Sequence, residues 1–314
     1  MKAVRFHEYG GPEVLTYEDV EVPVPGAGEV RIRVASTSFN GIDANIRGGG
    51  MLGPMPVVLP HTPGIDVAGT VDALGDGVSG LRVGDAVVAF LPMVADGASA
   101  EQVLAPTELL TAAPTSIPLA DAAALPSVGL TAWQALFDHA GLTSGQRLLV
   151  NGAGGAVGGY AVQLAKAAGA HVIATASAHS RERVRAAGAD EVVDHTSTDV
   201  MAAVTEPVDV VLNLAPVAPE QLTAFAALVR DGGVVVSTTV WMPAPSDEQR
   251  GVRGIDLFVR SDAAQLAELV ARVDRGELRV DVAQRTPLAE LATVHAQAAA
   301  GTLPGKVVIV VARA

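Results

Sequence analysis

The sequence contains no cysteine. Disulfide bonds, thiolate nucleophiles and cysteine-ligated zinc are therefore excluded for this chain. Aromatic residues make up only 4% of the chain, and no stretch approaches the roughly 20 uninterrupted apolar residues of a membrane-spanning helix. The opening segment MKAVRFHEYG mixes charges with its apolar residues and lacks the apolar core of a secretory signal. We therefore expect a cytoplasmic protein with no membrane partner.

Positive charge is also scarce. Lysine and arginine number 21 against 34 aspartates and glutamates, which gives a formal net charge of -13. An acidic surface repels phosphate backbones, so we expect no nucleic-acid partner. A small anionic ligand is still permitted, because it responds to the charges of its own site. The length of 314 residues suggests two domains at roughly 150 residues per domain.

The first part of the chain, to about residue 119, is typical of short strands joined by turns. Apolar and polar residues alternate from Glu29 to Val34, after a turn rich in proline and glycine. The segments GIDVAGTVDALG and GDAVVAF continue this texture and are broken by glycines. We expect a β-rich domain of hairpins here.

From about residue 120 helices and strands alternate. LADAAALPSVGLTAWQALFDHAGL is a broken helix, and the strands RLLVN, HVIATAS, EVVDH, DVVLNLA and GVVVSTT follow. Between them lie the helical patterns VGGYAVQLAKAAG, SRERVRAAG and LTAFAALVRDG, the last ending at Gly232 and Gly233. This alternation predicts parallel β-α units with right-handed crossovers. The last part of the sequence predicts a helix and a strand in LFVRSDAAQLAELVARVDRGELRV, a helix in PLAELATVHAQAAAG and a strand in KVVIVVA. The pattern leaves open which domain these last elements join.

A cluster of glycines fills the turn between the strand RLLVN and the helix that follows it. The register Ala153-x-Gly155-x-x-Gly158 matches the dinucleotide pattern G-x-G-x-x-G, with alanine in the first position. The first small residue permits a tight turn, Gly155 lets the backbone approach a diphosphate, and Gly158 lets the helix pack against the strand. Tight packing without a ligand is the alternative. The residues that we expect to bind the cofactor here are Gly152, Ala153, Gly154, Gly155, Ala156, Val157 and Gly158, where the helix dipole also favours an anion.

The end of the second strand indicates which dinucleotide is bound. NAD enzymes usually have an acidic residue there, but the segment reads TASAHSR, with Ser177 at the strand end and Arg181 beyond it. A hydroxyl and a guanidinium suit a 2′-phosphate, so we expect NADPH bound by Ser177 and Arg181. His179 is an alternative neighbour of the phosphate. For Arg181, Arg183 and Arg185 taken singly, the solvated face of a helix is the competing interpretation.

The block NGAGGAVGGYAVQLAKAAGAHVIATAS, followed by GADEVVDH, resembles the zinc-independent quinone oxidoreductases of the medium-chain dehydrogenase/reductase superfamily, which include zeta-crystallin. The segments SFNGIDANIRGG, LPHTPGIDVAGTVDALGDGVSGLRVGDAVVAF, LPSVGLTAWQAL and GKVVIVV are similar to further motifs of that family, in the same order. The resemblance implies an α/β fold of two domains. A chaperonin-10-like (GroES-like) β-rich domain would take residues 1–119 and 257–314. A Rossmann domain with a doubly wound parallel sheet would take residues 120–256.

The resemblance also bears on zinc. Zinc-dependent relatives have Gly-His-Glu where this chain has Gly64-Ile65-Asp66, so Ile65 replaces the ligand histidine. Their cysteine ligand near Ser38 to Asn40 and their four-cysteine lobe are absent as well. The remaining histidines, including His61 and His139, lack ligand spacing. We expect no catalytic zinc. The remaining chemistry is transfer of a hydride from the cofactor to an electron-poor acceptor, a quinone or the β-carbon of an enone.

The resemblance implies a loop near the cofactor that carries Asn40, Asp43 and Arg47. We expect Asn40 to contact the nicotinamide ribose or the substrate, and Asp43 and Arg47 to pair with each other. Asn213 and Thr239 end two strands at the carboxyl edge, where open α/β sheets bind ligands. The further residues expected near the cofactor are Thr131, Leu214, Val240, Trp241 and Lys306. Lys306 has the alternative of an ordinary surface lysine.

The loop RGGGMLGPMPVVLP departs from the family, because quinone reductases often carry a tyrosine there. This loop has Met51, Leu52 and Met55 instead, so we expect a more apolar pocket, with water or a ribose hydroxyl supplying the proton. Phe258 either lines this pocket or packs in a core. The candidates that face substrate or nicotinamide are Asn40, Asp43, Thr131 and Phe258.

Three functions remain open. The preferred one is an NADPH-dependent, zinc-independent reductase of quinones or small α,β-unsaturated carbonyls. The second is an enoyl-thioester reductase of fatty-acid or polyketide type, and the third a non-catalytic NADPH-binding protein. The resemblance also implies a homodimer formed by sheet edges. The run GVVVSTTVW either provides such an edge or lies inside the sheet.

Overall fold

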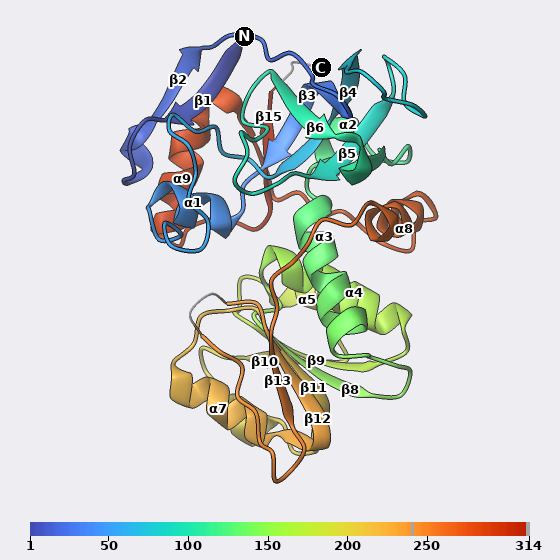
Figure 1. Ribbon diagram of the computed structural model, residues 1–314. Helices are drawn as coiled ribbons and strands as arrows, with labels where there is room; N and C mark the ends of the chain where they lie inside the picture. Colours follow the sequence, from blue (N-terminus) through green and yellow to red (C-terminus); the bar gives the residue numbers. More distant parts are fainter. Residues whose placement is uncertain (240–241, 312–314) are drawn as a thin grey trace. The chain divides into compact units, whose positions relative to one another are not determined.

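The computed structural model describes residues 1–239 and 242–311 and divides the chain into two compact units (Figure 1). Unit 1 contains Met1–Ser127, Ser261–Gly276 and the described part of Val280–Ala314. Unit 2 contains Val128–Arg260 and Glu277–Arg279. The C-terminal helices and the last strand therefore share a unit with the N-terminal strands. Within the described residues, no helix combines the length and the apolar composition that a bilayer span requires.

Unit 1 is built around a seven-stranded sheet with the order β14-β15-β3-β4-β5-β7, in which β6 pairs with β3. A second, two-stranded sheet pairs β1 with β2. The strands are β1 (Lys2–Phe6), β2 (Leu15–Asp19), β3 (Glu29–Ser38), β4 (Asp66–Leu74), β5 (Ala86–Phe90), β6 (Gln102–Pro106), β7 (Thr111–Ala112), β14 (Gln284–Pro287) and β15 (Val307–Val310). The helices are η1 (Pro12–Val14), α1 (Gly41–Arg47), η2 (Thr107–Leu109), α2 (Leu119–Ala122), α8 (Ala263–Asp274), η4 (Leu288–Glu290) and α9 (Leu291–Ala299).

The alternation predicted from Glu29 to Val34 is confirmed in β3. Val30, Ile32 and Val34 are buried, whereas the residues between them are partly or fully exposed. These three side chains belong to one apolar cluster with residues of β4, β5 and β6. One buried face per strand is the usual pattern of an antiparallel sheet that packs on a core.

Unit 2 contains a six-stranded parallel sheet with the order β10-β9-β8-β11-β12-β13. The first strand in sequence lies inside the sheet and the order reverses beside it, which is the Rossmann arrangement. Figure 1 shows α4 and α5 on one face of the sheet and α7 on the other. The elements are α3 (Pro126–Trp133), η3 (Gln134–His139), β8 (Arg147–Asn151), α4 (Ala156–Ala167), β9 (His171–Ala176), α5 (Arg181–Ala186), β10 (Glu191–Asp194), α6 (Val200–Ala203), β11 (Val208–Asn213), α7 (Pro219–Ala227), β12 (Val229–Ser237) and β13 (Arg253–Asp256). The first two residues of α3 belong to unit 1.

Three details of the sequence interpretation need correction. The helix expected to end at Gly232 ends at Ala227, because Val229 already pairs with Val208 of β11. The run GVVVSTTVW offers no free edge in its described part, because β12 lies between β11 and β13. The strand expected in GELRV is absent from the described residues. A strand forms a few residues later instead, as β14, which pairs with β15.

Candidate active-site residues and dinucleotide-binding turn

The glycine turn joins β8 to α4. Gly152 has a φ of +85°, which side-chain-bearing residues rarely adopt, and an added Cβ would lie 2.9 Å from the Ala215 Cβ. At Gly158 an added Cβ would lie 2.5 Å from both the Cα and the carbonyl oxygen of Ala153. Because those atoms are backbone, they cannot rotate away. Helix α4 therefore reaches this distance from the turn only with glycine at position 158.

Gly155 is the N-cap residue of α4, and its surroundings are different. The one atom within 4 Å of an added Cβ is the carbonyl oxygen of Gly152, at 3.4 Å. Packing within the chain therefore leaves this side of the turn open. The first amides of a helix lack intrahelical partners and attract an anion. An open backbone beside such amides fits a diphosphate, which is the ligand that the fingerprint predicts.

The expected 2′-phosphate residues lie together after β9. Ser177 and Ser180 form a turn, with the Ser177 amide donating to Ser180 Oγ at 3.2 Å. Arg181 begins α5, and its side chain is 36% exposed and paired with Asp194 at 2.9 Å. The Nε of Arg181 is buried and has no hydrogen-bond partner within the described residues. This orphaned donor beside a hydroxyl-bearing turn fits a further anionic group. His179 is exposed on the same turn.

The neighbouring arginines differ from each other. Arg183 donates to the carbonyl oxygen of Gly154 at 2.8 Å, so it contributes to the geometry of the glycine turn. The solvated-face interpretation is therefore wrong for Arg183. Arg185 is exposed and pairs with Glu182 within α5, as that interpretation predicts.

The carboxyl ends of β11 and β12 carry the other expected cofactor residues. Asn213 is fully buried and hydrogen-bonds Asn151, Ser237 and Thr239 through its carboxamide. The Leu214 amide donates to the carbonyl oxygen of Asn151 at 2.9 Å. Val240 and Trp241 lie outside the described residues.

In unit 1, Asp66 is the centre of a buried polar group that we call the Asp66 cluster. Its members are Ser38, Asn40, Asp66, Ser127 and Lys306. The Oδ2 atom of Asp66 accepts from Ser38 Oγ at 2.5 Å, from Ser127 Oγ at 2.8 Å and from Asn40 Nδ2 at 2.9 Å. Its Oδ1 accepts from the Ser127 amide at 2.7 Å. The carboxylate is fully buried, so these donors replace the water that it has lost.

Lys306 supplies the positive charge of the Asp66 cluster. Its Nζ lies 3.4 Å from Asp66 Oδ2 and also donates to Asn40 Oδ1 at 2.7 Å and to the Phe39 carbonyl at 3.3 Å. The residue is 5% exposed, so the surface-lysine alternative is wrong. Burial lowers the pKa of this ammonium below its usual range, and the carboxylates of Asp66 and Asp43 oppose that shift.

Asn40 joins this cluster and helix α1. Its Nδ2 donates to Asp66 and to the Ser38 carbonyl, while its Oδ1 accepts from Lys306 and lies 3.1 Å from Ser127 Oγ. The side chain is therefore held in one orientation. A cofactor would contact Asn40 on the part of its carboxamide that these partners leave uncovered, or would replace one of these hydrogen-bond partners.

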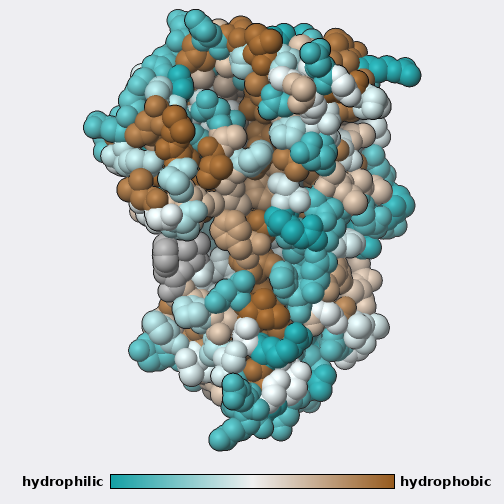
Figure 2. Space-filling view, viewed as in Figure 1, coloured by the Kyte–Doolittle hydropathy of each residue, from teal (hydrophilic) through white to brown (hydrophobic). Residues whose placement is uncertain are grey.

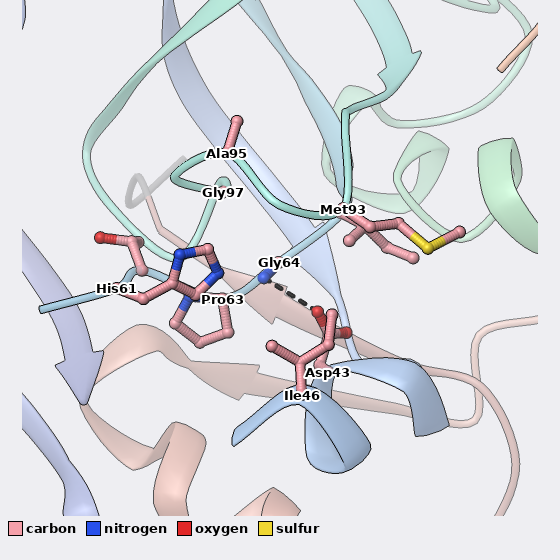
Figure 3. A pocket seen from close by; sticks show the side chains of 10 residues that line it. Asp43, Ile46, His61, Pro63, Gly64, Met93, Ala95 and Gly97 are labelled. Carbon is pink, nitrogen blue, oxygen red and sulfur yellow. Dashed lines mark hydrogen bonds between the residues drawn. The ribbon is translucent and has the colours of Figure 1, made fainter. Parts of the chain in front are cut away.

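Asp43 and Arg47 take different partners, so the expected pair between them is wrong. Asp43 accepts from the Asn40 amide and from the Gly64 amide, each at 3.0 Å, and thereby ties the start of α1 to the segment before β4. Burial raises the pKa of the Asp43 carboxyl to about 7, and the two amides act in the opposite direction. Figure 3 shows this carboxyl on the wall of a cavity of about 10 Å³, room for about one water, with His61 and Met93 also lining it.

Arg47 is buried and contacts α9. Its Nε donates to the Gly10 carbonyl at 3.2 Å, and its Nη1 lies 2.9 Å from His295 Nδ1. A guanidinium only donates, so Nδ1 of His295 accepts and the imidazole is neutral. Burial and the Arg47 charge together lower the pKa of His295 to about 3.

This lowered pKa makes the stability dependent on pH. The unfolded chain takes up a proton on His295 below about 6.5, whereas the folded protein does not until about 3, so stability falls as pH decreases between these values. We expect His295→Gln, which keeps an acceptor for Arg47, to show a shallower loss of urea midpoint over this range than the wild type. His179→Gln, at an exposed histidine, is the control and should follow the wild-type curve. Parallel curves for wild type and His295→Gln would contradict the assignment.

The apolar loop and Phe258 are placed differently from expectation. Met51 is buried and packs with Phe6 and Ile46, so it belongs to a core and not to an apolar pocket. Met55 packs against the same cluster, whereas Leu52 is exposed. Phe258, in unit 2, is 59% exposed, so the core-packing alternative is wrong for this residue. Figure 2 shows apolar residues interspersed with hydrophilic ones on the face in view.

Thr131 lies in α3 and is 8% exposed.

Sequence reasoning missed the central role of Asp66, although the residue lies in a segment that resembles the family. It also missed Thr175, a buried threonine whose hydroxyl accepts a hydrogen bond from the Gly152 amide of the glycine turn. A polar residue near the end of a mostly apolar strand was the available signal for Thr175.

Comparison with known proteins identifies the family. Residues 26–115 match the model described as "Alcohol dehydrogenase GroES-like domain", and residues 187–309 match "Zinc-binding dehydrogenase". The "Chloroplast envelope quinone oxidoreductase homolog" of Arabidopsis thaliana is 34% identical and covers 98% of each chain. Among solved structures, the quinone oxidoreductase from Coxiella burnetii has a TM-score of 0.91 at 29% identity, over 99% of each chain. CurK enoyl reductase has a TM-score of 0.87 at 25% identity, again over 99% of each chain.

One of these descriptions names zinc. In the part of the chain that the structure describes, no group of three or more histidine, cysteine, aspartate or glutamate side chains is placed to hold a metal ion. Nearly the full length of the chain aligns with a quinone oxidoreductase homolog, and its two units have the GroES-like and Rossmann architectures. The chain therefore belongs to the zeta-crystallin-like quinone oxidoreductase family of the medium-chain dehydrogenase/reductase superfamily, whose members depend on a nicotinamide dinucleotide.

Proposed function

We propose that the protein is an NADPH-dependent, zinc-independent reductase of quinones or small α,β-unsaturated carbonyls. The observation that carries this proposal is the glycine turn, where Gly158 is required by backbone packing and Gly155 leaves the turn open. Its family membership as an oxidoreductase supports the reaction class. The isoleucine at position 65, in place of a ligand histidine, supports reduction without a Lewis acid.

The residues have separate roles in this proposal. When bound, the nicotinamide supplies the hydride. The first amides of α4, from Ala156 onward, hold the diphosphate, because the Gly155 amide already donates to the carbonyl oxygen of Gly152. Ser177 and Arg181 hold the 2′-phosphate. Asp66 and Lys306 fix the side chain of Asn40, which is the residue that we propose to contact the nicotinamide ribose or the substrate. Rigid positioning of this kind lowers the entropy cost of reaching the reactive geometry.

Absorbance at 340 nm tests the proposal directly. Purified protein is mixed with NADPH or NADH and with 1,4-benzoquinone, a cyclic enone or a crotonyl thioester. We expect oxidation of NADPH with the quinone or the enone, and slower oxidation of NADH. Activity with the thioester alone would favour an enoyl-thioester reductase, a function that the likeness to CurK enoyl reductase supports. No oxidation with any acceptor, despite measurable NADPH binding, would favour a non-catalytic protein and refute the proposal.

Replacement of Arg181 tests the choice of cofactor. Arg181→Ala removes the guanidinium beside Ser177, and loss of a charged hydrogen bond weakens binding by about tenfold or more. We expect the KM for NADPH to rise by about that factor and the KM for NADH to stay nearly unchanged. Arg185→Ala is the matched control, because Arg185 is exposed on the same helix and pairs with Glu182. Equal effects of Arg181→Ala on the two cofactors would rule out a phosphate role.

A further inference from the structure

The strands of unit 2 that surround the glycine turn carry buried polar residues at their last position or, in β9, at the position before it. These are Asn151 on β8, Thr175 on β9, Asn213 on β11 and Ser237 on β12, each no more than 5% exposed. They follow one another across the sheet, because β9, β8, β11 and β12 are adjacent. Asn213 is in register with Asn151 on one side and with Ser237 on the other. Apolar side chains occupy most positions of these strands, so a polar row at their ends needs an explanation.

Hydrogen bonds join this row into a chain that ends at the turn. Asn213 Nδ2 donates toward Thr239 Oγ1 at 3.3 Å, and Asn151 Nδ2 donates to Asn213 Oδ1 at 2.8 Å. Thr175 Oγ1 donates to Asn151 Oδ1 at 2.9 Å. The same hydroxyl oxygen accepts from the Gly152 amide, also at 2.9 Å. We call these residues, with Ser237, the strand-end network.

Thr175 holds the start of the turn from two sides. Its side chain binds the Gly152 amide, and its carbonyl oxygen accepts from the Ala153 amide at 3.2 Å. Its hydroxyl has a single hydrogen, which goes to Asn151, so its lone pair remains directed to Gly152. Gly152 has a positive φ and glycine's flexibility, so its peptide would otherwise sample several orientations. The hydroxyl fixes the residue from which the rest of the turn is built.

We infer that Thr175 is a positioning residue for the dinucleotide, and that Asn151 and Asn213 act through it. The strand-end network sets the affinity of the turn by fixing Gly152, without any contact between Thr175 or Asn213 and the cofactor. This assigns to Asn213 a role different from the direct contact expected from its place at a strand end, because its carboxamide is fully buried and engaged at both ends. The inference rests on the proposed function, since it requires that the turn binds a dinucleotide.

Two substitutions at Thr175 separate this role from simple packing. Thr175→Val keeps the shape and removes the hydroxyl, whereas Thr175→Ser keeps the hydroxyl. We expect Thr175→Val to raise the dissociation constant and KM of NADPH and of NADH alike, by about tenfold, because the partly buried Gly152 amide loses its acceptor. The kcat should change by less than about twofold, since the groups near the reacting atoms are untouched. Thr175→Ser should restore the wild-type dissociation constant within about twofold.

Ile173→Val is the control for a core change on the same strand, because Ile173 is buried and makes no such hydrogen bond through its side chain. It should lower the thermal midpoint and leave dinucleotide binding as in the wild type. Asn213→Ala should raise the dissociation constants of both dinucleotides as well. In the double variant with Thr175→Val, the further rise caused by Asn213→Ala should be smaller than the rise it causes alone, as expected for residues that act along one chain of contacts.

The outcomes separate the inference from the proposed function. If Thr175→Val bound the dinucleotides with wild-type affinity but had a lowered thermal midpoint, the hydroxyl would be purely structural. That outcome would overturn the inference and leave the proposed function standing. Full additivity of Asn213→Ala and Thr175→Val would overturn the role given to Asn213. Failure of the wild-type protein to bind either dinucleotide in calorimetry would overturn the proposed function and the inference with it.

Discussion

Replacing Asp66 with alanine is expected to lower the free energy of unfolding of unit 1 by about 3–5 kcal/mol, because it leaves a buried ammonium unpaired. Lys306 would lose its ion pair while remaining enclosed, and Ser38, Ser127 and Asn40 would lose a shared acceptor. Denaturant unfolding monitored by circular dichroism measures this loss. We expect reductase activity to fall in parallel at temperatures where the protein remains folded, since Asn40 is no longer held.

Two further variants sharpen this test. Lys306→Met leaves the Asp66 carboxylate buried without its cation and should lower the free energy of unfolding by a similar amount. Asp66→Asn combined with Lys306→Met should lower it by less than the sum of the losses measured for Asp66→Asn and Lys306→Met alone. Asp19→Ala is the control, since Asp19 pairs with Lys2 at the surface and is 79% exposed. Its unfolding midpoint should match the wild type. An Asp66→Ala variant as stable as Asp19→Ala would show that the Asp66 cluster is not held by its charges.

Gly158→Val is expected to raise the dissociation constant for NADPH at least about 100-fold, because a displacement of α4 by about 1 Å misplaces the amides that hold the diphosphate. The added Cβ would meet the Ala153 backbone at 2.5 Å, and neither backbone segment can yield without moving α4 or the turn. Calorimetry or fluorescence titration with NADPH measures the effect.

The chain provides a matched control one residue later. An added Cβ at Gly159 meets no atom within 4 Å, and Gly159 lies in the same helix. Gly159→Ala should bind NADPH as the wild type does and should raise the thermal midpoint slightly, since alanine is favoured over glycine in helices by about 1 kcal/mol. If Gly158→Val bound NADPH as tightly as Gly159→Ala, the close approach of α4 to the turn would have no role in binding.

Local patterns in the sequence predicted the parts of the structure that depend on local rules. The alternation over Glu29 to Val34 gave the buried face of β3, because successive side chains in a strand point to opposite faces. The glycine spacing located the turn before α4 for a similarly local reason, since both the positive φ at Gly152 and the close contact at Gly158 involve near neighbours in sequence.

The Asp66 cluster could not be derived in this way. Its members lie at positions 38, 40, 66, 127 and 306, and no spacing or periodicity links them. The family resemblance named Asn40 and Lys306 but not the carboxylate that holds them. The pair expected between Asp43 and Arg47 failed for a related reason. Spacing of four in a helix permits an ion pair. Asp43 instead accepts from the amides of Asn40 and Gly64, and Arg47 contacts Gly10 and His295.

Calorimetric titration of the wild-type protein with NADPH and with NADH tests the central claim most directly. We expect each chain to take up one NADPH and to bind NADH more weakly, because NADH lacks the phosphate that Ser177 and Arg181 would hold. Absence of binding heat with both dinucleotides at millimolar concentration would contradict it, whatever activity the protein shows in other assays.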